Sequence, residues 1–393
     1  LGDARVTGYR CRTNIASNTA FRGFGGPQGM MAIEQIMDAI ARYLGRDPLA
    51  VRRLNFYGGA GRDVTHYEQP VRQNLARAIT DRLADSACYA ERRAEIARFN
   101  AASPVLKRGL ALTPVKFGIS FTATFLNQAG ALILVYSDGT VQLNHGGTEM
   151  GQGLNTKVAQ IVADVLQIPL ADIQVTATTT GKVPNTSPTA ASSGADLNGK
   201  AAEAAARTLK ARLTAMLCQQ CACEESDVAF HNGVVRAGER YFSFAQVANM
   251  AWLNQVPLSA TGFYKVPGIH YDRTKGKGEP FYYFAWGAAC SEVVIDTLTG
   301  EYRLLRTDIL HDVGSSLNPA LDIGQIEGGF LQGAGWLTSE ELVWDDKGRL
   351  LSDGPMSYKI PAVGDMPEVF NVALLESTPN EAHTVYRSKA VGE

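Results

Sequence analysis

The sequence lacks the charge imbalance, the long apolar runs and the cysteine framework that mark several protein classes. Its 393 residues carry a net charge of −2 with no long Lys/Arg run, which argues against a nucleic-acid partner. No apolar run reaches membrane-spanning length, so no membrane partner is expected. Six cysteines in so long a chain do not indicate a disulfide framework, and a reducing, cytoplasmic compartment is the simpler expectation. Hydrophobic residues make up 45% of the chain and charged residues 19%, which predicts a folded protein with a large core.

Several catalytic and metal-binding motifs are also absent. There is no phosphate loop of the G-x-x-x-x-G-K-[ST] type, no G-x-S-x-G elbow and no H-E-x-x-H helix. Cys218, Cys221 and Cys223 cluster, but they lack the second Cys/His group that a zinc or iron–sulfur site requires. We therefore expect these cysteines to pack at the end of an Ala-rich helix. His145 is expected to be a hydrogen-bonded structural residue. Neither end resembles a natural terminus, so the chain is expected to be part of a longer protein.

What the sequence does contain is a series of small-residue loops that precede helices. Ser17–Met30 holds Arg22, Phe24 and several glycines, and an apolar helical pattern over 28–43 follows at once. The segment 145–153 leads into a predicted helix over 154–166, and 182–194 leads into one over 196–218. Glycine lets the backbone approach a ligand, and helix N-termini favour negative charge. Together such loops could enclose a flat, phosphate-bearing cofactor; a set of unrelated turns is the alternative.

The periodicity predicts helices up to about residue 99 and, after a change of period near Arg108, strands interspersed with helices. Asp47 is a candidate N-cap for a short helix over 48–55, and 71–99 reads as one charged, solvated helix. A basic loop at 273–278 is expected to be mobile. A helix is expected to begin at Asn318–Pro319. Strands are expected at 109–121, over 131–144 with a hairpin turn at 137–140, at 173–178, and at 284–296 and 302–309, which form a hairpin across 297–300. A final β region is expected to include 341–344, 350, 360 and 369–375.

Six segments of the sequence form a set with a definite order and spacing. They are Thr19–Gln28, Gly118–Thr122 with Phe125–Gly130, His145–Gly153, Ser187–Ser192, Asp312–Pro319 with Asp322–Gly328, and Lys389–Glu393. In register, they resemble the molybdenum-binding region of the xanthine dehydrogenase/xanthine oxidase and aldehyde oxidase family. The order and spacing hold from about residue 5 to the end, and Gly118–Gly130 resembles xanthine dehydrogenases more than aldehyde oxidases.

The resemblance implies an α+β fold of two elongated mixed subdomains. Residues 1–107 would be the last part of the first molybdopterin-binding subdomain with a helical connector, and 108–393 the second. The cofactor would be molybdopterin, its metal held by the pterin dithiolene and not by side chains. Iron–sulfur clusters of the 2Fe-2S type and FAD would lie on other domains or subunits, and the complete enzyme would be a homo-oligomer.

The resemblance also assigns roles to individual residues. Glu393 matches the general base, which would deprotonate the hydroxyl on molybdenum that attacks a purine carbon while hydride passes to the Mo=S sulfur. A glutamate suits this role because burial can raise a carboxyl pKa toward neutrality. Phe24 and Phe121 match the pair that sandwiches the ring, and Thr122 and Ala191 would line the same pocket. The cofactor-binding residues would be Ala20, Phe21, Arg22, Gly23, Gln152, Ala190, Ser192 and Gln325.

The implied activity is oxidative hydroxylation of hypoxanthine and xanthine to urate. An aldehyde or N-heterocycle oxidoreductase is one alternative, and a non-catalytic cofactor-binding module is another. The family's substrate-orienting arginine and second active-site glutamate belong to a segment that this sequence lacks. The isolated chain is therefore expected to be inactive.

Overall fold

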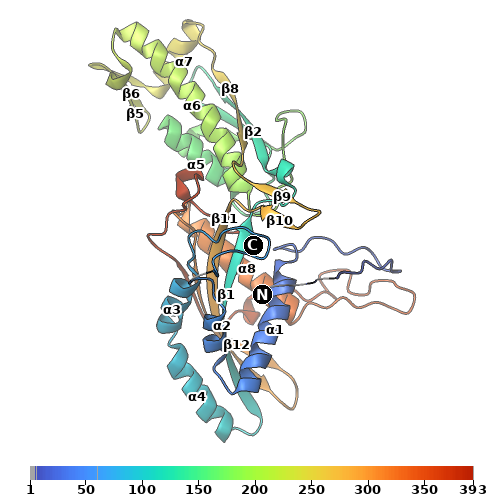
Figure 1. Cartoon of the computed structure of the whole chain (residues 1–393). Coiled ribbons are helices and arrows are strands. Elements are labelled where there is room, and N and C mark those ends of the chain that lie inside the picture. The colour runs from blue at the N-terminus through green and yellow to red at the C-terminus, as the bar shows by residue number, and fades with distance from the viewer. Residues whose placement is uncertain (1–4, 6, 60, 393) are drawn as a thin grey trace.

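Two long strands form the spine of one end of the molecule. β1 (Leu106–Ile119) and β11 (Tyr283–Asp296) pair antiparallel along their whole length. β12 (Tyr302–His311) and β13 (Val369–Leu374) extend this sheet in the order β1-β11-β12-β13. The structure is a computed structural model that describes residues 5, 7–59 and 61–392 (Figure 1).

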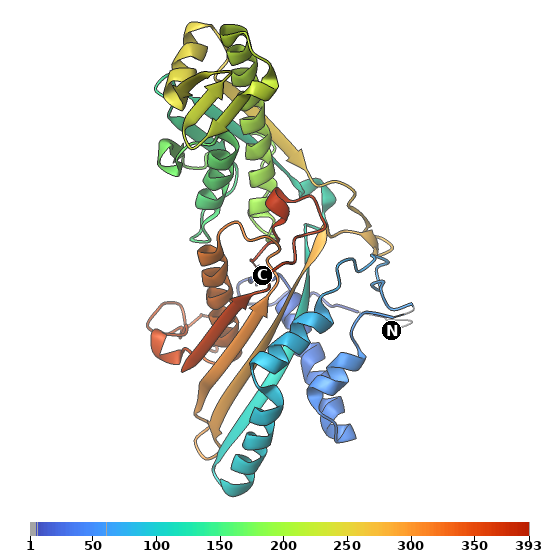
Figure 2. The same cartoon turned by 90° about the vertical axis from the view of Figure 1, so that its left-hand side faces the viewer.

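Helices surround this sheet. α3 (Ala76–Ser86) and α4 (Tyr89–Ala102) pack on β1, and α8 (Pro319–Leu337) packs beside β13 (Figure 2). α1 (Gly26–Leu44) contacts α2 (Pro48–Leu54). Asp47 caps α2 as predicted, since its carboxylate accepts bonds from two backbone N–H groups of the first turn.

The single solvated helix predicted over 71–99 is wrong on two counts. The chain breaks between α3 and α4 at Cys88, whose φ of 51° is left-handed. In α4, Arg92 is buried and pairs with Glu292 at 2.9 Å and Asp308 at 3.0 Å. Because these partners lie on β11 and β12, α4 is anchored to the sheet and is not a free connector.

A second lobe is built on another mixed sheet, in the order β4 (Ile173–Val175), β3 (Val141–His145), β2 (Gln128–Val135), β8 (Ser259–Lys265). α6 (Gly194–Cys221) crosses this sheet and packs against α5 (Leu154–Leu166). The approach is close, because a Cβ on Gly262 would lie 2.0 Å from the carbonyl oxygen of Ala201. The alanine richness of α6 therefore serves tight packing against β8.

Smaller elements complete this lobe. β5 (Val228–His231), β6 (Val234–Ala237) and β7 (Arg240–Ser243) form a three-stranded sheet, and α7 (Phe244–Leu253) follows with a Ser243–Gln246 capping box. β9 (His270–Asp272) and β10 (Lys277–Glu279) form a hairpin around the basic loop. Cys221 and Cys223 pack against the core at the end of α6, as expected.

The final β region is confirmed only in part, because β13 matches the strand expected at 369–375. Only β13 forms a strand between residues 338 and 374, while Trp344 and Leu350 form an isolated bridge. The α+β prediction itself is confirmed, and the two lobes give the elongated outline seen in Figures 1 and 2. The division at residues 107/108 stays a prediction. Among the described residues, no helix is both long and apolar enough to cross a membrane.

Candidate functional site

A cavity of about 1480 Å³ is lined by residues from both lobes. Its walls come from the loop before α1, the end of β1, the loops before α5 and α6, the start of α8 and the last described residues. Segments up to about 370 residues apart in the sequence therefore meet at one place.

The structure brings the predicted site residues together in this cavity. Glu393 lies outside the described residues, but its neighbour Gly392 lines the wall. The roles of these residues stay predictions. The predicted residues that line the cavity are Ala20, Phe21, Arg22, Gly23, Phe24, Phe121, Thr122, Gln152, Ala190, Ala191, Ser192 and Gln325.

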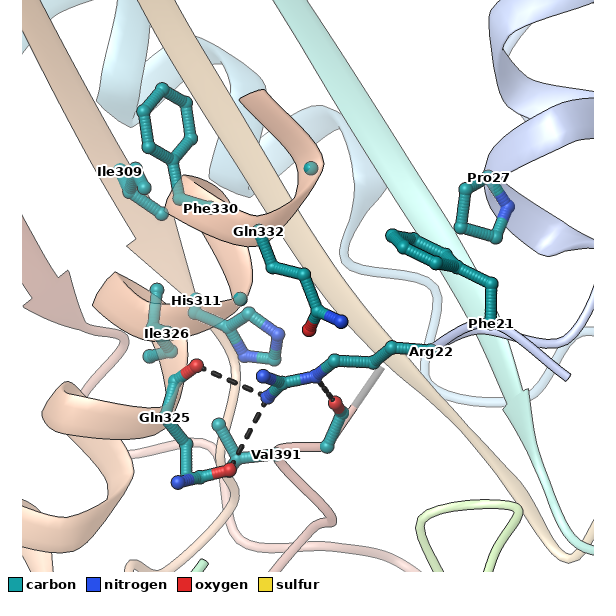
Figure 3. A pocket seen from close by; sticks show the side chains of 13 residues that line it. Phe21, Arg22, Pro27, Ile309, His311, Gln325, Ile326, Phe330, Gln332 and Val391 are labelled. Carbon is teal, nitrogen blue, oxygen red and sulfur yellow. Dashed lines mark hydrogen bonds between the residues drawn. The ribbon is translucent and has the colours of Figure 1, made fainter. Parts of the chain in front are cut away.

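Arg22 joins three of the segments that form the wall. Its Nε donates to the carbonyl oxygen of Gly392, and a terminal nitrogen donates to the backbone oxygen and the Oε1 of Gln325, each at 3.2 Å (Figure 3). A smaller cavity of about 210 Å³ lies beside it, lined also by His311 and Gln332. Burial lowers the pKa of His311, and its ring nitrogen Nδ1 lies 3.0 Å from the Asp312 carbonyl oxygen.

The loop before α6 has the features of an anion cradle. Ala191 and Ser192 are both left-handed, with φ of 56° and 53°, and α6 begins at Gly194. The first backbone N–H groups of a helix have no partner within the helix and favour an anion. The Ser192 hydroxyl is buried and finds no hydrogen-bond partner within the described part of the chain. Because a buried hydroxyl needs a partner, these residues fit a polar cofactor such as molybdopterin.

Phe24 and Phe121 both line the cavity, but they differ in how far they are exposed to solvent. Phe24 is 81% exposed, whereas Phe121 is half-buried. The backbone of Phe121 is fixed by Asn127, whose Oδ1 accepts from its N–H and whose Nδ2 donates to its carbonyl, both at 2.8 Å. Sequence reasoning gave Asn127 no role, although it lies within one of the matching segments.

We expect Asn127→Ala to lower the free energy of unfolding by about 1–3 kcal/mol, because it leaves the partly buried backbone N–H and C=O of Phe121 without partners. Asn127 is only 2% exposed, so water cannot replace the lost bonds easily. Urea unfolding measures the change. The matched control, Asn254→Ala at the exposed end of α7, should cost less than about 0.5 kcal/mol. Equal costs for the two variants would contradict this role of Asn127.

Gln152 braces its own loop. Its Oε1 accepts from the N–H of Met150 at 2.6 Å, and its Nε2 donates to the carbonyl of Thr148 at 2.8 Å. The neighbouring Glu149, which has no role in the resemblance, accepts from the backbone N–H groups of Gly151 and Gly153 in the same loop and of Asn155 in α5. Partial burial acts to raise the pKa of Glu149, but these bonds outweigh it and the pKa is lowered.

His145 is buried at the end of β3. Its Nδ1 accepts from the N–H of Gly147 at 3.1 Å, as expected of a structural residue. Burial lowers the pKa of His145, so the ring is neutral near pH 7. Among the described residues, no group of three or more His, Cys, Asp or Glu could hold a metal ion.

Comparison with known proteins gives matches along the whole chain. Two family models described as molybdopterin cofactor-binding domains match residues 82–367 and 1–56. Xanthine dehydrogenase/oxidase of Gallus gallus is 48% identical over 393 residues, which is 100% of this chain and 27% of that protein. Xanthine dehydrogenase of Dictyostelium discoideum is 45% identical over 396 residues, which is 100% of this chain and 28% of that protein. The chain therefore spans little more than a quarter of the length of these curated relatives.

Solved structures with the same fold agree. Quinoline 2-oxidoreductase from Pseudomonas putida 86 has a TM-score of 0.81 at 25% identity, covering 95% of this chain and 48% of that one. An aldehyde oxidoreductase from Desulfovibrio desulfuricans has a TM-score of 0.75 at 22% identity, and the match covers 95% of this chain and 37% of that one. The family models and the shared fold thus define the class of the chain as a molybdopterin cofactor-binding region.

The chain belongs to the molybdopterin cofactor-binding domain family. Its sequence is homologous, over its full length, to a segment of xanthine dehydrogenases.

Proposed function

We propose that this chain supplies the molybdopterin-binding part of a xanthine dehydrogenase that oxidises hypoxanthine and xanthine to urate. One observation carries the proposal: every described residue to which the resemblance assigns a role lines the same cavity. The near 48% identity to a xanthine dehydrogenase/oxidase makes a purine the favoured substrate.

When bound, molybdopterin would supply the redox centre that accepts two electrons and delivers oxygen. Arg22, Gln325 and the loop Ala190–Ser193 would hold it through hydrogen bonds. Phe24 and Phe121 would hold the flat ring of the substrate between them and exclude water, with Thr122 and Ala191 completing the wall. A carboxylate oxygen of Glu393 would take the proton released as the new carbon–oxygen bond forms.

The complete enzyme would need further parts. The two electrons must leave the site, so we place 2Fe-2S clusters and FAD on other domains or subunits of a cytoplasmic homo-oligomer. A separate observation is the exposed apolar side of α1, with Ile33, Ile36 and Ile40. An apolar stripe this long favours a covering partner, and we assign it to the rest of the first molybdopterin-binding subdomain.

The isolated chain tests the proposal. Purified from a host that makes molybdopterin, it should show no xanthine oxidation with an artificial electron acceptor, whereas the complete enzyme should turn over. Robust turnover by the isolated chain would contradict the proposed division of the site. Molybdenum by mass spectrometry and pterin by fluorescence are measured on both proteins. A folded complete protein with neither would favour a non-catalytic module.

One match favours a second substrate class. The quinoline 2-oxidoreductase shares the fold at 25% identity, so an N-heterocycle or aldehyde oxidoreductase is the alternative. Comparing kcat/KM of the complete enzyme for xanthine, a quinoline and an aldehyde separates these. A preference for quinoline or aldehyde would replace the purine assignment while leaving the cofactor assignment intact.

A further inference from the structure

The last described residues form a strap across the cavity wall, which we call the C-terminal segment (Ser388–Gly392). It lies where the two lobes meet (Figures 1 and 2). Ser388 bridges Gly314, and the N–H of Lys389 donates to the carbonyl oxygen of Val313 at 2.7 Å. At the other end, Arg22 holds the carbonyl of Gly392. The segment is therefore fixed at both ends by groups far away in the sequence.

A buried pair of side chains holds the middle of this segment. The Tyr283 hydroxyl, at the start of β11, donates to Oδ2 of Asp196 at 2.6 Å. The same hydroxyl accepts from the N–H of Ala390 at 2.8 Å. Asp196 is the third residue of α6 and lines the cavity. One hydroxyl thus joins β11, α6 and the C-terminal segment.

The direction of these bonds follows from the chemistry of the hydroxyl. A phenol has one proton to donate and lone pairs to accept with. Because the hydroxyl donates its hydrogen bond to Asp196, it can use only a lone pair toward Ala390, and it therefore accepts from the Ala390 N–H. Burial raises the pKa of Tyr283, so the phenol stays protonated at any working pH. Burial also raises the pKa of Asp196 to about 7, against the opposing effects of the Tyr283 bond, Lys157 and Lys200.

We propose that Tyr283 and Asp196 are positioning residues for Glu393, because they fix the backbone of the C-terminal segment that leads into it. Only Val391 and Gly392 separate the anchored Ala390 from Glu393. Neither Tyr283 nor Asp196 need touch substrate, since both act through the backbone of the C-terminal segment. The inference rests on the proposed function, in which Glu393 is the base.

The test uses the complete enzyme with Tyr283→Phe, which keeps the ring but removes the hydroxyl. We expect kcat for xanthine to fall roughly 100-fold, the loss associated with a displacement near 1 Å, with KM changed by less than about twofold. Molybdenum content should be unchanged. Hydrogen exchange of the Ala390 amide should speed up at least about tenfold, a readout that does not depend on activity.

Three further variants make the result decisive. Tyr282→Phe is the matched control, because its hydroxyl meets Tyr264 and not the C-terminal segment. Asp196→Asn keeps an acceptor for the phenol and should retain most of the activity. Asp196→Ala removes that acceptor, and it should raise Ala390 exchange even if Tyr283→Phe fails to fold.

The possible outcomes are distinguishable. Unchanged exchange in Tyr283→Phe, or a parallel loss of molybdenum, would overturn the positioning role. Normal kcat in Tyr283→Phe beside an inactive Glu393→Gln would overturn it while the proposed function stands. An active Glu393→Gln would instead remove the proposed base, and with it the reason for this inference.

Discussion

Replacing Glu393 by Gln in the complete enzyme is expected to lower kcat for xanthine by about 10²–10⁴-fold, the usual contribution of a general base. Glutamine keeps the size of the side chain and can still form hydrogen bonds, but it cannot take the proton. The residues predicted to hold the cofactor, among them Arg22, Gln325 and Ser192, are unaltered. Molybdenum and pterin content should therefore match those of the unchanged enzyme. Steady-state kinetics and metal analysis on one preparation check both expectations.

The control for this variant is Glu376→Gln, the same change at an exposed residue near the end of β13. Its kcat and metal content should both equal those of the parent enzyme. A Glu393→Gln enzyme with normal turnover would exclude Glu393 as the base. Loss of molybdenum together with activity would instead show that Glu393 supports cofactor binding.

Local signals in the sequence predict the elements that depend on local chemistry. The helix predicted over 154–166 matches α5 at both ends, and Asp47 caps α2 as expected. In each case the deciding contacts lie within a few residues along the chain, where period and capping rules apply.

Elements that depend on distant partners are the ones that sequence reasoning misses. The sequence neighbours of Arg92 are charged and helical, as for an arginine on the surface. Its partners Glu292 and Asp308, however, come from strands about 200 residues later. The interruption at Cys88 has no Gly or Pro to mark it. Nothing local distinguishes these residues from solvated ones, so tertiary packing overrides the pattern.

The candidate site also combines features that the local sequence reveals with features that depend on distant residues. The loops rich in small residues can be found from the sequence, and the resemblance assigns roles to their residues. The residues that support them cannot be found in this way. Asn127 fixes Phe121 through backbone bonds, and Tyr283 reaches Asp196 from 87 residues away. Asparagine, tyrosine and aspartate are common residue types, and only their three-dimensional neighbours reveal these roles.

Lys389→Met is expected to lower the free energy of unfolding of the chain by about 3–5 kcal/mol, because it leaves a buried carboxylate without its partner. The Lys389 Nζ pairs with Oδ2 of Asp312, and both side chains are 0% exposed. Oδ1 of Asp312 also accepts from the N–H of Gly314, so the carboxylate organises the backbone that the C-terminal segment crosses. Methionine fills much of the volume of lysine, which leaves the lost charge as the main change. Urea unfolding followed by circular dichroism measures the difference.

A double-mutant cycle separates the ion pair from packing. Adding Asp312→Asn to Lys389→Met should recover part of the loss, because a neutral amide costs less to bury than an unpaired charge and still accepts from Gly314. The surface control is Lys275→Met, whose ammonium lies 3.8 Å from Asp272 and whose side chain is 77% exposed. That variant should cost less than about 0.5 kcal/mol, since exposed pairs are screened by water and salt. If Lys389→Met cost no more than this control, the buried pair would not be what secures the C-terminal segment, and its anchoring would depend on the Gly314 bridge, Tyr283 and Arg22.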